Sequence, residues 1–132
     1  MKVLDPGHCY HVNIYDLGKG IHSDLLRRCI ETIQFMKREG ENYPGNVGRY
    51  PGTNCQELIR VVIDRLKYVD NQIMDPANIH AIYSLRTALH DLEIRAARRH
   101  GLKLPAFKFE EIENLPTCLH CGHIVCGEWR DW

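Results

Sequence analysis

The spacing of apolar residues predicts two long amphipathic helices in the second half of the chain. Apolar residues recur at intervals of three and four positions in two successive series. The first series is Cys55, Leu58, Val62, Leu66, Val69 and Ile73, and the second is Ile79, Ile82, Leu85, Leu89, Leu92 and Ala96. Such intervals place the members of a series on one face of a helix. We therefore expect helices over about 54–73 and 76–100, each burying one apolar face.

The residues at the ends of these segments agree with this prediction. Thr53 and Gln56 match a capping box at the start of the first helix. Asp75 followed by Pro76 is typical of an N-cap and a first helical residue. Gly101 is suited to end the second helix. Because the connection is so short, the two helices are expected to pack as an antiparallel hairpin.

The first half of the chain has the pattern of a small β-sheet. Residues 8–15 alternate between apolar and polar side chains, and residues 30–37 contain several β-formers. A helix over 22–37 is the alternative for the second segment, because apolar residues there also fall at helical spacings. Residues 39–52 contain four glycines and two prolines, which predicts a loop.

These elements together predict an α+β fold. A small N-terminal antiparallel sheet, with strands within about 8–38, is expected to pack on the long two-helix hairpin. Residues 1–101 would form this domain, since 132 residues suffice for one core. Residues 102–132 would form a linker, with a short strand or helix around Phe107 and Phe109, and a cysteine-rich C-terminal extension.

Composition narrows the possible functions. Seventeen Lys and Arg balance seventeen Asp and Glu, so the chain lacks the net positive charge on which non-specific nucleic-acid binding depends. No apolar run approaches the roughly 20 residues needed to cross a bilayer, and no signal-like stretch opens the chain, so we expect a cytosolic protein without membrane contact. No Ser-His-Asp order, glycine-rich phosphate loop or paired carboxylates stand out. We therefore expect a protein that is not an enzyme.

The C-terminal extension carries half of the six cysteines, as Cys118, Cys121 and Cys126. A Cys-x-x-Cys-Gly turn is common in zinc knuckles, in which two thiolates bind the metal at about 2.3 Å. With Cys126 and either His123 or His120, the turn would supply a tetrahedral set for a structural zinc ion.

Two other interpretations of the extension stay open. In one interpretation, the cysteines are thiols that bind no metal, or two of them form a redox pair. A fourth zinc ligand would alternatively come from another subunit or from the first strand, where the candidates are His8, Cys9 and His11. A catalytic zinc ion is not expected, because no glutamate stands beside the ligands as a general base.

Basic residues cluster at the end of the second predicted helix. Arg95 and Arg99 are four positions apart and so project from one helix face. Cations at a helix C-terminus favourably complement the helix dipole, which is one explanation of the pair. The other is a phosphate clamp, because guanidinium groups grip phosphate oxygens through paired hydrogen bonds. Tyr68 and Asn78, near the connection of the hairpin, would offer a stacking face and a polar contact.

Several segments carry a resemblance to a known family. They are 52–59 (GTNCQELI), 63–68 (IDRLKY), 78–79 (NI) and 92–99 (LEIRAARR), with weaker support from 7–10 and 33–37. In these segments the chain resembles the Thoeris anti-defence one family, small phage proteins of the sponge type. The similarity covers roughly residues 4–101, and the cysteine-rich extension lies outside it.

The resemblance implies a phage-encoded protein in the host bacterial cytoplasm that sequesters nucleotide signals without cleaving them. Its ligands would be cyclic ADP-ribose isomers made by the TIR protein of the Thoeris system, and cyclic trinucleotides at separate sites. The family's stacking aromatic falls on Tyr68, where Tyr replaces the usual Phe, and its polar contact falls on Asn78. Its arginine pair at the cyclic-nucleotide sites falls on Arg95 and Arg99. The family forms dimers that assemble into hexamers.

A protein of another class is the alternative to the sponge. The Cys-x-x-Cys turn and the arginine cluster would also suit a small zinc-containing module that binds nucleic acid or another protein. Such a module would not capture a cyclic ADP-ribose signal.

Overall fold

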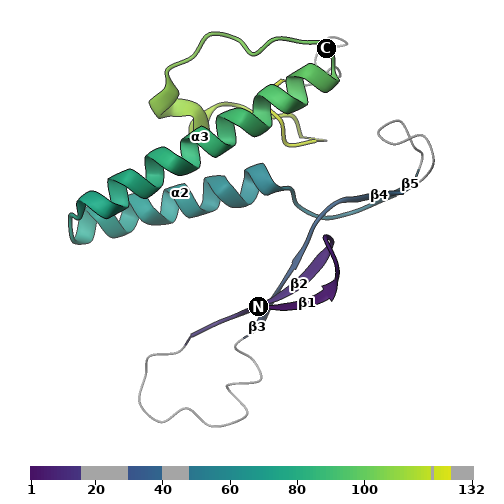
Figure 1. Cartoon of the computed structure of the whole chain (residues 1–132), viewed down its shortest axis with the longest axis horizontal. Coiled ribbons are helices and arrows are strands. Elements are labelled where there is room, and N and C mark those ends of the chain that lie inside the picture. Colours follow the sequence, from purple (N-terminus) through teal and green to yellow (C-terminus); the bar gives the residue numbers. More distant parts are fainter. Residues whose placement is uncertain (16–29, 40–47, 120, 126–132) are drawn as a thin grey trace. The chain divides into compact units, whose positions relative to one another are not determined.

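The computed structural model describes residues 1–15, 30–39, 48–119 and 121–125 (Figure 1). The chain divides into two compact units, Met1–Asn54 and Cys55–Trp132, which we call the N-terminal unit and the helical unit. A three-stranded antiparallel sheet precedes two packed helices, so the predicted α+β class is confirmed. Packing of the sheet on the hairpin stays a prediction.

The N-terminal unit contains two small antiparallel sheets. The first has the order β1 (Lys2–Asp5), β2 (Cys9–Asn13) and β3 (Ile30–Gln34), and the second pairs β4 (Lys37–Glu39) with β5 (Gly48–Tyr50). Residues 30–37 are therefore extended, and the alternative of a helix reaching residue 37 is wrong. The prediction missed β1, and it also missed β5, which lies within the predicted loop.

A close backbone approach explains the glycine at position 52. The segment that follows β5 passes beside the end of β3, where Thr53 N–H donates to the Gln34 carbonyl at 2.8 Å and Met36 N–H donates to the Thr53 carbonyl at 2.8 Å. A Cβ at Gly52 would lie only 2.3 Å from the carbonyl carbon of Phe35. Only glycine fits there without displacing the strand.

The helical unit begins with the predicted hairpin. The helices α2 (Cys55–Gln72) and α3 (Pro76–Arg99) lie within two residues of their predicted bounds. The Asp75 carboxylate accepts the Ala77 N–H at 2.8 Å, as an N-cap should. Gly101 has a φ of 65°, which is the left-handed conformation expected just after a helix. Of the described helices, none combines the length and apolar character needed to span a membrane.

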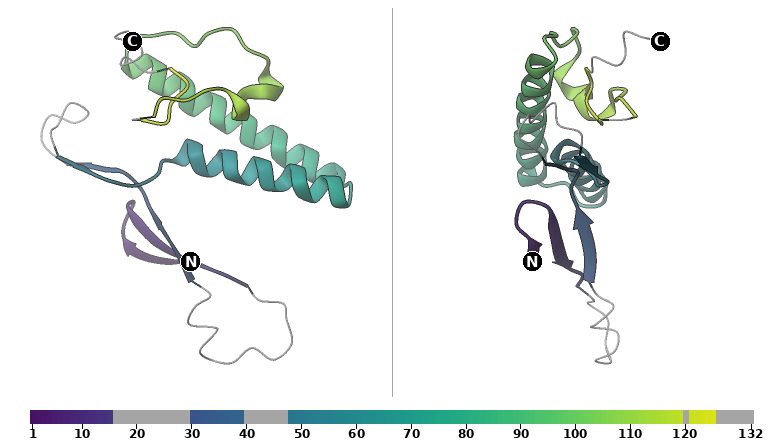
Figure 2. Two further views of the ribbon diagram at one scale, coloured as in Figure 1. Left: turned by 180° about the vertical axis from the view of Figure 1, so that it is seen from behind. Right: turned by 90° about the vertical axis from the view of Figure 1, so that its right-hand side faces the viewer.

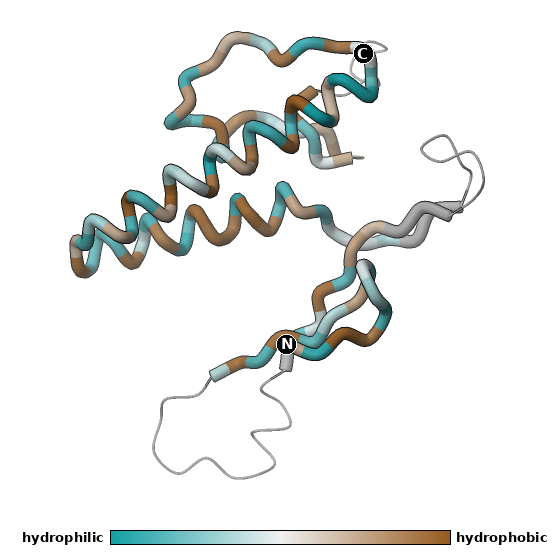
Figure 3. The backbone as a smooth tube through the Cα atoms, viewed as in Figure 1, coloured by the Kyte–Doolittle hydropathy of each residue, from teal (hydrophilic) through white to brown (hydrophobic). Residues whose placement is uncertain are grey.

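The buried face of α2 differs from the predicted one. Ile63 is fully buried, and Ile59 and Leu66 pack against the core that it shares with Ile82 and Leu89 of α3. The predicted members Cys55, Val62 and Ile73 are exposed instead. Figure 3 shows the hydrophobic positions along both helices. The series on α3 is largely confirmed, since its exposed member is Ile79 at the first turn.

The segment after α3 determines which face of α2 is buried. It runs back along α3 and forms the short 3-10 helix η1 (Phe109–Asn114), which lies against α3 (Figures 1 and 2). Ile112 is fully buried in the core between the helices, and Phe107, Leu115 and Ile124 pack around it. Residues 102–119 and 121–125 therefore belong to the compact helical unit, and the predicted domain division at residue 101 stays a prediction.

Candidate functional site

Tyr68 presents an aromatic face on the surface of α2. The residue is 55% exposed, and the guanidinium carbon of Arg65 lies 5.3 Å from the ring centroid. Gln72 Nε2 donates to the Tyr68 hydroxyl at 3.1 Å. These neighbours are one turn away on either side, so they share the tyrosine's helix face. The result is a solvent-accessible ring with a cation beside it, an arrangement that suits a base linked to phosphate.

Asn78 lies at the connection of the hairpin and contacts a different residue of α2. Its Nδ2 donates to Asp70 Oδ1 at 3.3 Å, and the same oxygen accepts the Asp75 N–H at 3.0 Å. Asp70 and Tyr68 are two positions apart on a helix, which turns them about 200° away from each other. Tyr68 contacts Arg65 and Gln72, whereas Asn78 contacts Asp70. Within one chain, these predicted ligand contacts therefore face different sides.

The predicted arginine pair lies at the opposite end of α3. Arg95 is separated from Asn78 by seventeen residues of α3, or about 25 Å along the axis. Arg95 and Arg99 are both exposed. Arg95 and Arg99 consequently lie far from both Tyr68 and Asn78 along the hairpin.

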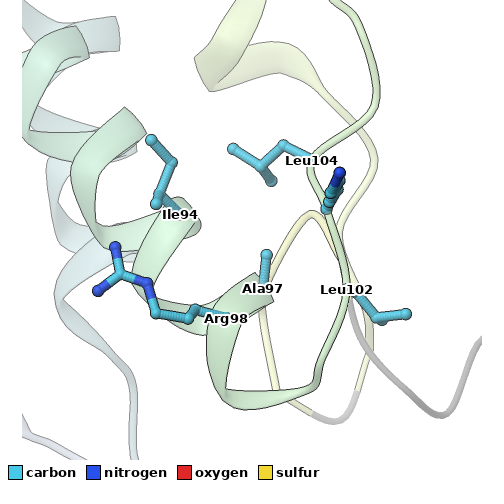
Figure 4. Close-up of a pocket in the computed structure, with 6 residues that line it drawn as sticks. Ile94, Ala97, Arg98, Leu102 and Leu104 are labelled. Atoms are coloured by element: carbon cyan, nitrogen blue, oxygen red, sulfur yellow. The ribbon is translucent and has the colours of Figure 1, made fainter.

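A shallow pocket of about 250 Å³ lies beside this basic end, between α3 and the segment that follows it (Figure 4). Ile94, Ala97 and Leu104 give it an apolar lining, and Arg98 and Lys103 supply two cations. An apolar surface bordered by cations suits a small anion with an apolar part. Arg98 was not predicted as a ligand. Its position in the sequence, between Arg95 and Arg99, could have indicated that it belongs to the same basic cluster.

The C-terminal extension folds into a tight turn at Cys118 and Cys121. Both thiols are buried and form a small cluster of their own. Gly122 N–H donates to the Cys118 carbonyl at 2.8 Å, and Cys118 N–H donates to the His123 carbonyl at 2.9 Å. Gly122 has a φ of 71°. This is the local geometry expected of a Cys-x-x-Cys-Gly knuckle.

The remaining predicted metal ligands are not gathered around these thiols in the described part of the chain. His123 Nδ1 lies 2.9 Å from Nε2 of the buried Gln56 instead. Cys126 and His120 lie outside the described residues. Within residues 1–15, 30–39, 48–119 and 121–125, no group of three or more His, Cys, Asp or Glu side chains could share a metal ion. Four-ligand zinc binding thus stays a prediction.

An ion pair inside the helical unit holds the turn against the hairpin. Arg60 Nη2 donates to Glu93 Oε1 at 2.9 Å, and Glu93 is 0% exposed. The other oxygen of Glu93 accepts the Ile124 N–H at 2.9 Å, and Arg60 Nη1 donates to the Gly122 carbonyl at 3.4 Å. The pair therefore joins α2, α3 and the knuckle.

A second ion pair fixes η1. Arg86 donates to both carboxylate oxygens of Glu113, at 2.6 Å from Nη2 and 3.0 Å from Nε, and Lys67 Nζ lies 3.5 Å away. Burial acts to raise the pKa of Glu113, but the hydrogen bonds and charge of Arg86, with the charge of Lys67, outweigh it. The pKa of Glu113 is therefore lower than the ordinary value of a glutamate. The hydrogen bond to Glu113 likewise raises the pKa of Arg86.

This ion pair predicts a loss of stability in acid. Because the pKa of Glu113 is lower in the folded state, the pair's contribution is present above the unfolded-state pKa of about 4.3 and is lost as pH falls through the folded-state pKa. We expect Glu113→Gln to reduce the pH dependence of the unfolding free energy below about pH 5. Urea denaturation from pH 3 to 7 measures this effect. Glu111→Gln, at an exposed position of η1, is the control and should keep the wild-type slope.

Comparison with protein-family models, with curated proteins and with solved structures found no match to this chain.

Proposed function

We propose that this chain is a non-enzymatic sponge that binds TIR-derived cyclic ADP-ribose and holds it intact, so that Thoeris immunity is not triggered. The proposal starts from the resemblance of residues 52–99 to the Thoeris anti-defence one family. The observation that carries it is the half-exposed Tyr68 ring with the Arg65 guanidinium at 5.3 Å. A base stacks on the ring, and the cation lies where a linked phosphate is reached.

The basic end of α3 forms the second part of the proposal. Arg95 and Arg99 bind a cyclic trinucleotide, whose three phosphates match forked guanidinium donors. Arg98 and Lys103, at the neighbouring pocket, add to the positive potential there. Net charge is zero for the whole chain, so this local cluster favours small anions over long polyanions.

The sponge is proposed to act as a symmetric dimer or a larger homo-oligomer. Tyr68 and Asn78 face different sides of one hairpin, so one pocket that uses both needs a second chain. An apolar surface is available on the outer face of α2, where Val61 and Val62 are exposed, and Ile73, directly after the helix, is exposed as well. Burying such a surface favours association.

Light scattering measures this assembly. At micromolar concentration we expect a particle of at least twice the 15.4 kDa of one chain. Val62→Lys, which places a charge on the exposed face of α2, should shift the particle toward the monomer and weaken capture of cyclic ADP-ribose. A monomer that binds the ligand at full affinity would contradict the shared pocket.

Tyr68 supplies the most direct test of the first site. Stacking on an aromatic side chain contributes about 1–3 kcal/mol per base, so Tyr68→Ala should weaken capture of cyclic ADP-ribose by roughly ten- to a hundredfold. Tyr68→Phe keeps the ring and should bind within about threefold of wild type, because the hydroxyl's contact with Gln72 is exposed. Calorimetric titration gives the affinities.

Tyr83 provides the matched control. It is another exposed tyrosine of the hairpin, but its ring packs on Phe109 with centroids 5.1 Å apart. Tyr83→Ala should leave ligand affinity unchanged. If Tyr68→Ala binds as tightly as wild type while retaining its helical circular dichroism, Tyr68 is not in the site.

The zinc-containing interaction module is the second candidate function, and the buried Cys118 and Cys121 favour it. The two candidate functions differ in whether the protein removes cyclic ADP-ribose from solution. An interaction module leaves cyclic ADP-ribose in solution, whereas the sponge withdraws it and returns it unchanged when the protein is denatured.

A further inference from the structure

We infer that the pocket beside the end of α3 binds a small amphipathic carboxylate, of the class of medium-chain fatty acids. The carboxylate lies at Arg98 and Lys103, and the alkyl chain lies against the apolar lining. Such a ligand differs in class from the nucleotides of the proposed function, and its binding does not depend on them.

The reversal of the chain after α3 forms the pocket. Gly101, with its left-handed φ of 65°, turns the chain back, and Leu102 N–H donates to the Ala97 carbonyl at 2.9 Å. Ile94 and Ala97 project from α3, and Leu104 projects toward them from the returning segment (Figure 4). The pocket therefore lies wholly within the helical unit.

The lining of the pocket suits a hydrocarbon. Ile94, Leu102 and Leu104 are each half-buried, and none of them belongs to the main hydrophobic core of the helical unit. Their accessible parts form an apolar surface that binds a hydrocarbon by removing it from water. Among the described residues that line the pocket, only Arg98 and Lys103 are polar and none is aromatic. A nucleobase would find no ring to stack on and few partners for its polar edge, so an alkyl chain fits better.

The charge around the pocket favours an anion. Residues 94–109 contain five lysines and arginines and no aspartate or glutamate, although the two kinds of charge balance over the whole chain. Arg98 and Lys103 are exposed, and no carboxylate of the described residues forms an ion pair with either. The carbonyls of Ala97 and Arg98 accept backbone N–H groups, which reduces the negative potential of the helix end. Because a guanidinium group offers a planar carboxylate two parallel hydrogen bonds, we assign the head group as a carboxylate.

The volume of the pocket limits the length of the alkyl chain. A cavity of about 150 Å³ lined by apolar side chains holds one benzene molecule, so the volume of about 250 Å³ here accommodates roughly eight to ten carbons. Since the pocket is shallow, one side of the alkyl chain stays in water. Each methylene that enters should therefore tighten binding by about two- to threefold, rather than by the roughly fourfold that full burial gives.

Calorimetric titration of the full chain with hexanoate, octanoate, decanoate and dodecanoate tests the proposal. We expect the affinity to rise by about two- to threefold per methylene up to decanoate and then to level off. Octan-1-ol, which has the alkyl chain of octanoate without the charge, should bind at least about tenfold more weakly than octanoate. Absence of decanoate binding at millimolar concentration overturns the proposal. An affinity that keeps rising to dodecanoate would show unspecific adsorption and would overturn it as well.

Variants distinguish the pocket from the rest of the basic segment. Arg98→Gln combined with Lys103→Gln should weaken decanoate binding at least about tenfold, and Leu104→Asp, which places a carboxylate in the lining, should abolish it. Lys108→Gln is the matched control, because Lys108 is an exposed cation of the same segment that does not line the pocket. It should keep the wild-type affinity within about twofold. If Lys108→Gln loses as much affinity as the double variant, the proposal is wrong. The double variant changes exposed side chains alone, so it keeps the test valid if Leu104→Asp does not fold.

Nuclear magnetic resonance locates the ligand, and vesicles test its source. Decanoate should shift the amide signals of residues 94–104 and leave those of Tyr68 and Asn78 unchanged, whereas shifts centred on Tyr68 overturn the assignment. A bilayer also presents alkyl chains beneath anionic head groups, so vesicles of phosphatidylglycerol form the second arm. We expect the protein to bind free decanoate and not to sediment with the vesicles. Sedimentation with vesicles in the absence of decanoate binding would indicate a membrane surface and contradict the proposal.

Discussion

Replacing Arg60 with methionine is expected to destabilise the helical unit by about 3–5 kcal/mol. The substitution leaves the carboxylate of Glu93 without its cation, although Glu93 is 0% exposed and its other oxygen accepts the Ile124 N–H. Removing one partner of a buried pair costs far more than the pair itself contributes, because the remaining charge stays desolvated. Urea denaturation followed by circular dichroism gives the free energy of unfolding.

Two further variants show whether this loss comes from the buried charge. Arg60→Met combined with Glu93→Leu removes both charges and should recover most of the stability lost in the single variant. Arg98→Met removes an exposed arginine of α3 and should change stability by no more than about 0.5 kcal/mol. A loss below about 1 kcal/mol for Arg60→Met would show that Glu93 is not held as the structure places it.

Changing Arg95 and Arg99 together to glutamine is expected to remove measurable binding of a cyclic trinucleotide. Hydrogen bonds to charged groups contribute about 1.5–3 kcal/mol each, so losing both should weaken binding by at least about a hundredfold. Binding of cyclic ADP-ribose should fall much less, because its proposed site centres on Tyr68 near the connection of the hairpin, whereas Arg95 and Arg99 lie toward the other end of α3, about 20–30 Å away along the axis by the helical rise. Titration of each ligand against the double variant measures both effects.

The comparison of the two ligands distinguishes the possible roles of the arginines. Raising the salt concentration should weaken trinucleotide binding by wild-type protein, since the contact is ionic. Equal loss of both ligands in the double variant would indicate one shared site. If the double variant binds both ligands as tightly as wild type, the arginines do not contact either ligand. Their role would then be the favourable interaction of cations with the helix C-terminus.

Local signals in the sequence were sufficient for the hairpin, but not for its buried face. The Asp75 cap and the left-handed Gly101 act within a few residues, so they could be predicted without any tertiary contact. On α2, apolar residues follow two parallel series, one through Val62 and one through Ile63. Choosing between them needs the position of Ile112, which lies some fifty residues later in the chain. No local pattern contains that information.

The polar contacts that fasten the C-terminal segment were missed for a related reason. Glu93 lies four residues after Leu89 and three before Ala96, and is therefore at a core position of α3. A charged residue at such a position signals a buried partner, but the spacing does not identify that partner as Arg60. The Cys118–Cys121 turn could be predicted because its bonds close within six residues, whereas the attachment of His123 to Gln56 spans 67 positions.

Release of a captured nucleotide tests the central proposal most directly. The full chain is incubated with the product of a TIR enzyme, separated from unbound nucleotide, and then denatured by heat. Mass spectrometry identifies and quantifies what is released, with Tyr68→Ala carried through as the matched control. We predict that wild-type protein depletes cyclic ADP-ribose from solution and returns the same molecule in the same amount, and that Tyr68→Ala returns much less. Recovery of a cleaved product, or no depletion by wild-type protein, would contradict a sponge.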